Sequence, residues 1–143
     1  MKTTPLRYSL IGLLALTVLY SCTKESDALK TPQQRILGKW SIVRESEKTY
    51  HYNTGALKDS TGVTIPYGTF TIEFRSDGKA YSTITENGST ERDTFDYVLQ
   101  GESLLLVDGE EYYIQHFTNN KLITTDYYDD GTSDVEHILE FAK

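Results

Sequence analysis

Residues 67–99 read YGTFTIEFRSDGKAYSTITENGSTERDTFDYVL, and this stretch decides the fold. Within it, residues 70–75 alternate apolar with polar side chains, which is the pattern of a strand with one buried face. The dipeptides Asp77-Gly78 and Asn87-Gly88 then mark tight turns, because these residue types adopt positive φ angles at low cost. The stretch therefore predicts consecutive antiparallel hairpins with one face toward water.

The same pattern continues toward the C-terminus, where turn residues recur every 8 to 13 residues, at Gly101, Asp108-Gly109, Asn119-Asn120 and Asp130-Gly131. We expect an all-β domain, an eight-stranded antiparallel up-and-down barrel, because closure removes the exposed edges of a meander. A two-sheet sandwich is the alternative, since the pattern alone does not show whether the first strand pairs with the last. The strands are predicted near 38–48, 67–75, 79–86, 91–99, 103–107, 111–118, 121–128 and 133–141.

A short helix is expected before the first strand. Thr31 can cap it, Pro32 suits its first position and Gln34 completes a capping box. Gly38 can end the helix in a left-handed conformation. The segment therefore predicts a helix of one to two turns that leads into Gly38-Lys39-Trp40.

The longest connection runs from residue 49 to residue 66 and has no clear strand pattern. Connections of this length are usually functional or disordered. We expect this one to fold over one mouth of the barrel.

The N-terminal segment has the organisation of an export signal. Lys2 and Arg7 give it a positive start, and residues 10–20, LIGLLALTVLY, form an apolar run of signal-peptide length. A transmembrane anchor is the weaker alternative, because a spanning helix usually needs about 20 apolar residues. We expect residues 1–21 to be removed as a signal peptide.

Residues 19–22 read LYSC and contain the only cysteine of the chain. They resemble the lipobox of bacterial lipoproteins, which implies cleavage between Ser21 and Cys22, a diacylglycerol on the Cys22 sulfur and an acylated, palmitate-type amino terminus. Residues 22–30 would then be a lipidated cysteine with a flexible tether, anchored in the outer membrane on its periplasmic face or at the cell surface. Residues 23–27, TKESD, resemble a surface-export tag of some Gram-negative lipoproteins, with a plain solvated linker as the alternative.

The domain expected over residues 31–143 resembles the lipocalin superfamily, and most closely the lipocalin-like domains of bacterial lipoproteins. The resemblance rests on the short helix that leads into Gly38 and Trp40. It implies that Gly38-x-Trp40 opens the first strand, that Trp40 closes one end of the barrel and that the next loop forms a lid. Lipocalins usually carry a late arginine that packs over this tryptophan, and no arginine follows Arg92 here.

A ligand cavity between the strands is one expectation, and a barrel filled by its own side chains is the other, because eight strands leave an interior only just wide enough for a ligand. The chain without its signal has nine tyrosines, and adjacent strand residues such as Tyr112 and Tyr113 point to opposite faces. The residues that we predict to contact a small apolar or amphipathic ligand, or to form its lid, are Tyr50, Tyr52, Phe70, Phe74 and Tyr97.

Other chemistry finds little support in the sequence. The three histidines, His51, His116 and His137, are far apart and lack a thiol partner, so we predict no metal site and no cofactor. The acidic stretch 126–137 fails as a calcium loop because Tyr128 and His137 occupy ligand positions. No nucleophile elbow, phosphate loop or metalloprotease motif is present, so we do not expect an enzyme.

Charge argues against nucleic acid as a partner. Without residues 1–21 the chain keeps 12 basic and 21 acidic residues, a net charge of −9, which repels phosphate backbones. The sequence therefore favours a membrane-anchored binding module for a small ligand. A filled barrel that docks onto a protein of the cell envelope is the alternative, with no partner identified.

Overall fold

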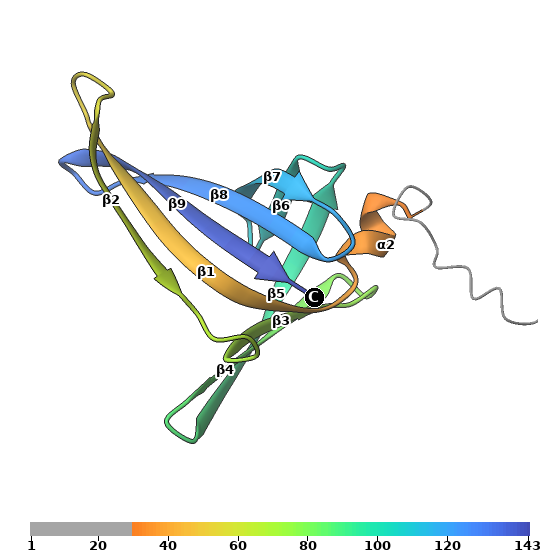
Figure 1. Ribbon diagram of the computed structural model, residues 1–143. Coiled ribbons are helices and arrows are strands. Elements are labelled where there is room, and N and C mark those ends of the chain that lie inside the picture. The colour runs from red at the N-terminus through yellow and green to blue at the C-terminus, as the bar shows by residue number, and fades with distance from the viewer. Residues whose placement is uncertain (1–29) are drawn as a thin grey trace, which may run out of the picture.

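The structure is a computed structural model, and it describes residues 30–143. The expected signal peptide, Ser21, Cys22 and most of the tether lie outside these residues. The chain order of the elements is α2 (Pro32–Ile36), β1 (Gly38–His51), β2 (Leu57–Thr64), β3 (Phe70–Phe74), β4 (Lys79–Glu86), β5 (Ser89–Gln100), β6 (Leu104–Val107), β7 (Glu110–Phe117), β8 (Lys121–Asp129) and β9 (Ser133–Ala142) (Figure 1).

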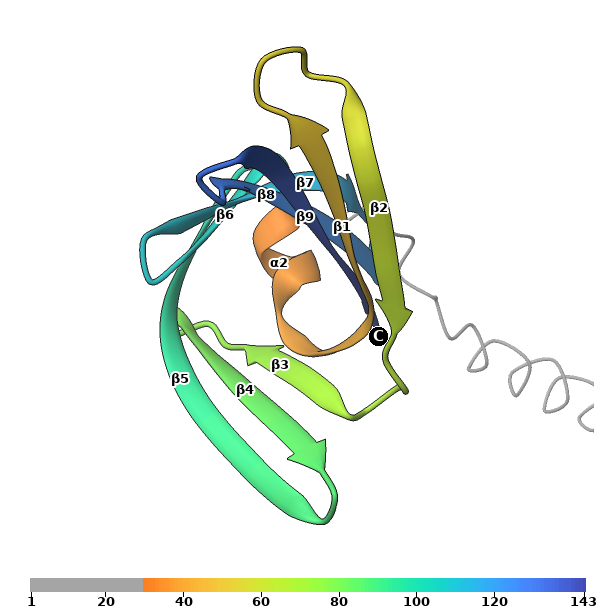
Figure 2. The same cartoon turned by 90° about the vertical axis from the view of Figure 1, so that its left-hand side faces the viewer.

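The sheet closes on itself. Strands β3 to β8 each pair antiparallel with the next strand in the chain. Strand β1 completes the ring, because its first residues, 38–41, pair with β3 while its other edge pairs with β9 from Ser41 to His51. The barrel therefore has eight strands, β1 and β3 to β9, and the closed form is confirmed over the sandwich (Figure 2).

Two of the hairpin turns have the predicted chemistry. Asn87 and Gly88 both have positive φ, 50° and 80°, and connect Glu86 to its cross-strand partner Ser89. Asp108 and Gly109 do the same between β6 and β7, with φ of 50° and 91°. Such two-residue turns match the twist of antiparallel strands, so they fix the register of both hairpins.

The segment 49–66 differs from the prediction of an irregular loop. Strand β1 continues to His51, and residues 57–64 form β2, which pairs with Arg44–Tyr50 of β1. All eight β2 residues are exposed. A strand that buries neither face needs no alternation of apolar and polar residues, so LKDSTGVT gave no strand signal.

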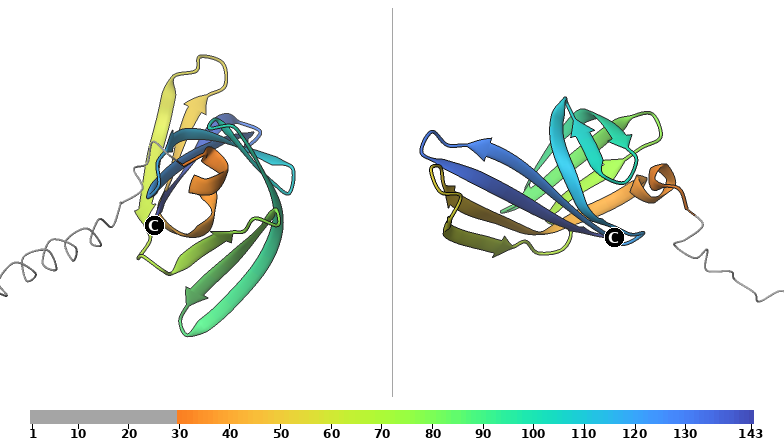
Figure 3. Two further views of the ribbon diagram at one scale, coloured as in Figure 1. Left: turned by 90° about the vertical axis from the view of Figure 1, so that its right-hand side faces the viewer. Right: turned by 90° about the horizontal axis from the view of Figure 1, so that it is seen from above.

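Trp40 closes one end of the barrel together with α2. Its side chain is fully buried, and its indole Nε1 donates a hydrogen bond to the carbonyl oxygen of Ile36 at 2.7 Å. The helix has the predicted capping box between Thr31 and Gln34. Figure 3 shows α2 at one end of the molecule and the β1–β2 hairpin at the other.

Lys143 lies over Trp40. Its ammonium is 4.2 Å from the centroid of the indole ring and donates hydrogen bonds to the carbonyl oxygens of Arg35 and Leu37, each at 2.7 Å. Arg35 in turn donates to the carbonyl oxygen of Phe117 and pairs with Glu102. These contacts join the helix to Lys143, to the end of β7 and to the turn between β5 and β6, and they seal this end.

Candidate functional site

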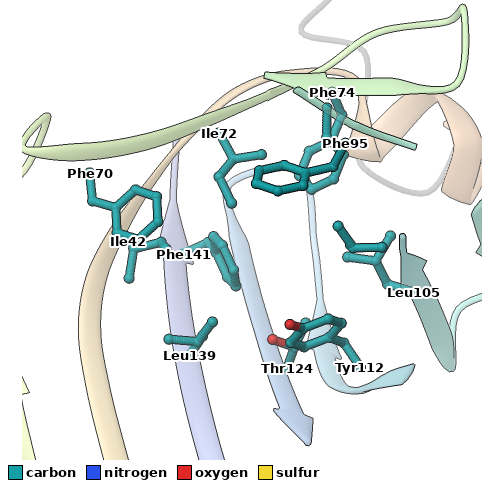
Figure 4. Close-up of a pocket in the computed structure, with 12 residues that line it drawn as sticks. Ile42, Phe70, Ile72, Phe74, Phe95, Leu105, Tyr112, Thr124, Leu139 and Phe141 are labelled. Atoms are coloured by element: carbon teal, nitrogen blue, oxygen red, sulfur yellow. The ribbon is translucent and has the colours of Figure 1, made fainter. Parts of the chain in front are cut away.

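A cavity of about 190 Å³ lies inside the barrel. Ten of the twelve side chains that line it are apolar, and the other two are Tyr112 and Thr124. Figure 4 shows most of these side chains converging from several strands of the ring. The apolar lining residues are Ile42, Phe70, Ile72, Phe74, Ala80, Phe95, Leu105, Val107, Leu139 and Phe141.

Strand alternation places these side chains inside the ring. On β3, residues Phe70, Ile72 and Phe74 share the inward face, as the sequence pattern predicted. On the opposite wall, Leu139 of β9 stands directly across from Thr124 of β8. The cavity is therefore lined by residues that are far apart in the sequence but whose side chains all point to the inner face of the barrel.

Thr124 is the unusual member of the lining. Its side chain is 1% exposed, and its hydroxyl has no hydrogen-bond partner within residues 30–143. A buried hydroxyl without a partner destabilises a folded protein, because it has lost its bonds to water. Tyr112 also lines the cavity, and burial raises the pKa of its hydroxyl, so this residue stays neutral.

A polar rim follows the cavity on the side away from Trp40; it consists of Glu45, Glu47, Asp126, Tyr128 and His137. The pair Asp126–His137 is the next inward pair of β8 and β9 after Thr124–Leu139. His137 contacts the carboxylates of Asp126 and Glu45, each at 2.9 Å, and Tyr128 donates to Glu47. Two carboxylates thus flank the imidazole of His137, and the third carboxylate of the rim, Glu47, accepts from Tyr128.

The rim carries a net negative charge even with a charged histidine. Burial lowers the pKa of His137, but the hydrogen bonds that its ring makes to the carboxylates of Asp126 and Glu45 outweigh burial and raise that pKa above its ordinary value of 6.5. Its side chain is 18% exposed, against 50% for Glu45, so the rim opens toward water.

The predicted ligand residues divide into two groups. Phe70 and Phe74 line the cavity. The ring of Tyr97 packs edge-on against that of Phe74, with 4.9 Å between the ring centroids, and its hydroxyl donates a hydrogen bond to the carbonyl oxygen of Arg75. Tyr50 is bonded to Glu136 on the outer wall, and Tyr52 is 65% exposed in the hairpin turn. No residue of the expected lid, 49–66, lines the cavity.

Sequence reasoning missed Thr124 and Leu139 as lining residues. The alternation of side chains along β8 could have identified Thr124, because Leu122, Thr124 and Asp126 fall on one face of this strand. The prediction that Tyr112 and Tyr113 point to opposite faces is confirmed, since Tyr112 lines the cavity and Tyr113 is 42% exposed.

The described part of the chain has neither a metal-binding cluster nor a membrane-spanning helix. Within residues 30–143 no group of three or more His, Cys, Asp or Glu side chains could hold a metal ion. No helix in the same range is long and apolar enough to cross a membrane.

Comparisons with known proteins show a structural similarity but no match in sequence. No family model matches the chain, and no curated protein matches it. Among solved structures, a deswapped triple mutant of bovine odorant binding protein is similar, with a TM-score of 0.43 and 16% sequence identity. That match covers 76% of this chain and 74% of the other chain.

Proposed function

We propose that this chain is a membrane-anchored lipocalin-like barrel that binds a small apolar or amphipathic molecule in its interior. The apolar cavity is the observation that carries this proposal. Apolar lining with a few polar groups is typical of small-molecule sites. The barrel has room for such a molecule without displacing the plug formed by Trp40.

The cavity volume limits the size of the ligand. Ligand pockets usually start at about 300 Å³, and the cavity measures about 190 Å³. An apolar cavity of about 150 Å³ nevertheless binds benzene in another protein. The proposed ligand therefore has on the order of ten non-hydrogen atoms or fewer.

Ethylbenzene is a suitable first probe, because it is apolar, soluble enough and of this size. We expect it to bind residues 23–143, which contain every element of the barrel, and to shift the NMR amide signals of Leu105, Thr124 and Leu139 saturably. A variant that fills the cavity, Leu139→Phe, should lose this binding, while Val63→Phe on exposed β2 should keep it. Unchanged spectra for the unsubstituted domain would reject the ligand proposal.

Membrane anchoring through Cys22 is the second part of the proposal, and it is supported by the lipobox-like residues 19–22. Each buried methylene of an acyl chain contributes about 0.8 kcal/mol to membrane binding, so several chains hold the domain firmly. We expect Cys22→Ser to move the protein from the membrane pellet to the soluble fraction, while Ser26→Ala leaves it in the pellet. A Cys22→Ser protein that stays in the pellet with its signal removed would contradict anchoring by lipid.

A filled-barrel protein that docks onto an envelope protein is the second candidate. It is supported by the outer wall, where the rings of Tyr113 and Tyr127 lie 6.0 Å apart and are 42% and 61% exposed. Exposed aromatic residues are enriched in protein interfaces. Crosslinking in intact cells from position 127 should then capture one specific protein, whereas crosslinking from exposed position 91 should not.

A further inference from the structure

The hydroxyl of Thr124 is a polar group in a cavity that is otherwise lined mostly by apolar side chains. It is almost fully buried, lines the cavity and has no partner within the described residues. Figure 4 places Thr124 near Tyr112 at the lower side of the cavity, away from Ile72 and Phe74. A molecule in the cavity would thus meet hydroxyls at one end and apolar side chains elsewhere.

A bound water molecule is a poor partner for this hydroxyl. An internal water typically makes about three hydrogen bonds, and Thr124 and Tyr112 are the only polar side chains in the lining. A ligand with its own hydroxyl or carbonyl group can make the single bond to Thr124 while its remaining atoms fill the apolar space. The lone hydroxyl therefore favours an amphipathic occupant over a purely apolar one.

Charge determines which polar group fits. None of the twelve lining side chains is charged, so an ionised ligand group would be buried without a counter-charge. An anion that points outward instead would meet the carboxylates of Glu45, Glu47 and Asp126. A cationic group inside the cavity would find no carboxylate in the lining, so it too would be buried without a counter-charge.

We infer that the occupant is a neutral compound of about ten non-hydrogen atoms or fewer, apolar apart from one hydroxyl or carbonyl group that hydrogen-bonds to the Thr124 hydroxyl. This inference rests on the proposed ligand-binding function and names its ligand class. Thr124 is then the residue that distinguishes alcohols and carbonyl compounds from hydrocarbons.

Three compounds with one carbon skeleton test the inference: ethylbenzene, 2-phenylethanol and phenylacetate. Their affinities for residues 23–143 are measured by NMR titration at neutral pH, where phenylacetate is anionic. Thr124→Val keeps the shape of the side chain and removes the hydroxyl. We expect it to weaken 2-phenylethanol binding about fivefold or more, since one hydrogen bond is lost, and to leave ethylbenzene within about twofold.

Thr125→Val is a matched control. Thr125 is equally buried on the same strand, and its hydroxyl also lacks a partner within residues 30–143, but it does not line the cavity. It should leave both affinities unchanged. Thr124→Ser keeps the hydroxyl and should retain binding of the alcohol, which separates loss of the hydrogen bond from a general disturbance of β8.

The outcomes separate the inference from the function on which it rests. Binding of ethylbenzene and 2-phenylethanol with no selective effect of Thr124→Val would overturn the role of Thr124 and leave the cavity a binding site. Phenylacetate binding as tight as that of the alcohol would overturn the neutral ligand class. Failure of all three compounds to bind would overturn both the inference and the proposed function.

Discussion

His137 links the stability of the rim to pH. Its pKa is raised in the folded protein relative to the ordinary value of 6.5, so the folded state holds this proton more tightly than the unfolded state. The stabilisation is fully present below pH 6.5 and is lost as the pH rises through the raised pKa of the folded state. His137 therefore stabilises the barrel mainly in acid and neutral solution.

Urea unfolding between pH 5.5 and pH 9 measures this contribution. We expect the free energy of unfolding to fall over the upper part of that range, and His137→Gln to remove this fall. His116→Gln is the control, because His116 is exposed on β7 and contacts neither Asp126 nor Glu45 in the described residues. Identical pH profiles for His137→Gln and the unsubstituted protein would refute the assignment.

Trp40 is the residue on which the closed end depends most. Trp40→Phe removes the hydrogen bond from Nε1 to the carbonyl oxygen of Ile36 and leaves a space beneath Lys143. We expect a loss of about 2–4 kcal/mol in the free energy of unfolding, from the cavity and the unpaired carbonyl together. Chemical denaturation measures it.

Tyr52→Phe is the comparison for this substitution, since Tyr52 is 65% exposed and should change stability by less than about 0.5 kcal/mol. Equal stability of Trp40→Phe and Tyr52→Phe would show that Trp40 is not needed to hold the closed end of the barrel together.

At the residue scale, sequence reasoning located the residues whose role follows from pattern. Phe70 and Phe74 on one strand face are of this kind, whereas the role of Trp40 was implied by the family resemblance. The role of Thr124 could not be predicted, because threonine is an ordinary strand residue. Its importance arises from the absence of a partner on β7 and β9, which only the packed barrel reveals.

At the element scale, β2 is the weakest strand of the sheet. It pairs only with β1, and all its side chains are exposed, whereas β8 is paired on both edges. Local opening should therefore cost much less in β2 than in β8. We expect the paired amides of β2 to exchange with deuterium at least about 100-fold faster than those of Leu122 and Thr124, which lie in the core.

Hydrogen exchange followed by NMR makes this comparison within one sample. The amides of β9 provide a second reference, because β9 closes the barrel between β8 and β1. Protection of β2 equal to that of β8 would mean that the hairpin is held by contacts beyond its pairing with β1.

The prediction of strands and turns from the sequence succeeded where characteristic turn residues mark a hairpin. It failed where a strand has no alternation of apolar and polar side chains. Asn87-Gly88 and Asp108-Gly109 fixed two hairpins, since their positive φ angles suit few other residue pairs. Strand β2 was missed because solvent covers both of its faces. The same property explains why 57–64 does not cover the cavity, because a strand without an apolar face has nothing to bury there.

At the scale of the whole molecule, closure of the ring depends on contacts between the two ends of the described chain. Strand β1 pairs with β9 over most of its length, in the register Ile42–Phe141 to His51–Ser133. No local pattern encodes which distant strands meet, so the sequence left barrel and sandwich both open. The closure also creates the interior that a sandwich would fill by packing two sheets together.

The two ends of the barrel differ, and this difference determines how the proposed anchor would orient the cavity. Helix α2 and Trp40 seal the end where the described chain begins, and the polar rim lies beyond the cavity on the other side. Residues 22–29 can span at most about 28 Å when fully extended. An anchor at Cys22 would therefore hold the sealed end near the membrane and leave the rim facing the aqueous phase.

Energy transfer to an acceptor attached to lipid headgroups tests this orientation. A fluorophore at Ser103→Cys, next to the Arg35–Glu102 pair at the sealed end, should transfer energy more efficiently than one at Tyr52→Cys in the distant β1–β2 turn. A Cys22 that carries the proposed lipid would not react with the label, so each variant would carry one dye. More efficient transfer from position 52 would mean that the rim faces the membrane, and a neutral ligand would then enter from the lipid phase instead of from water.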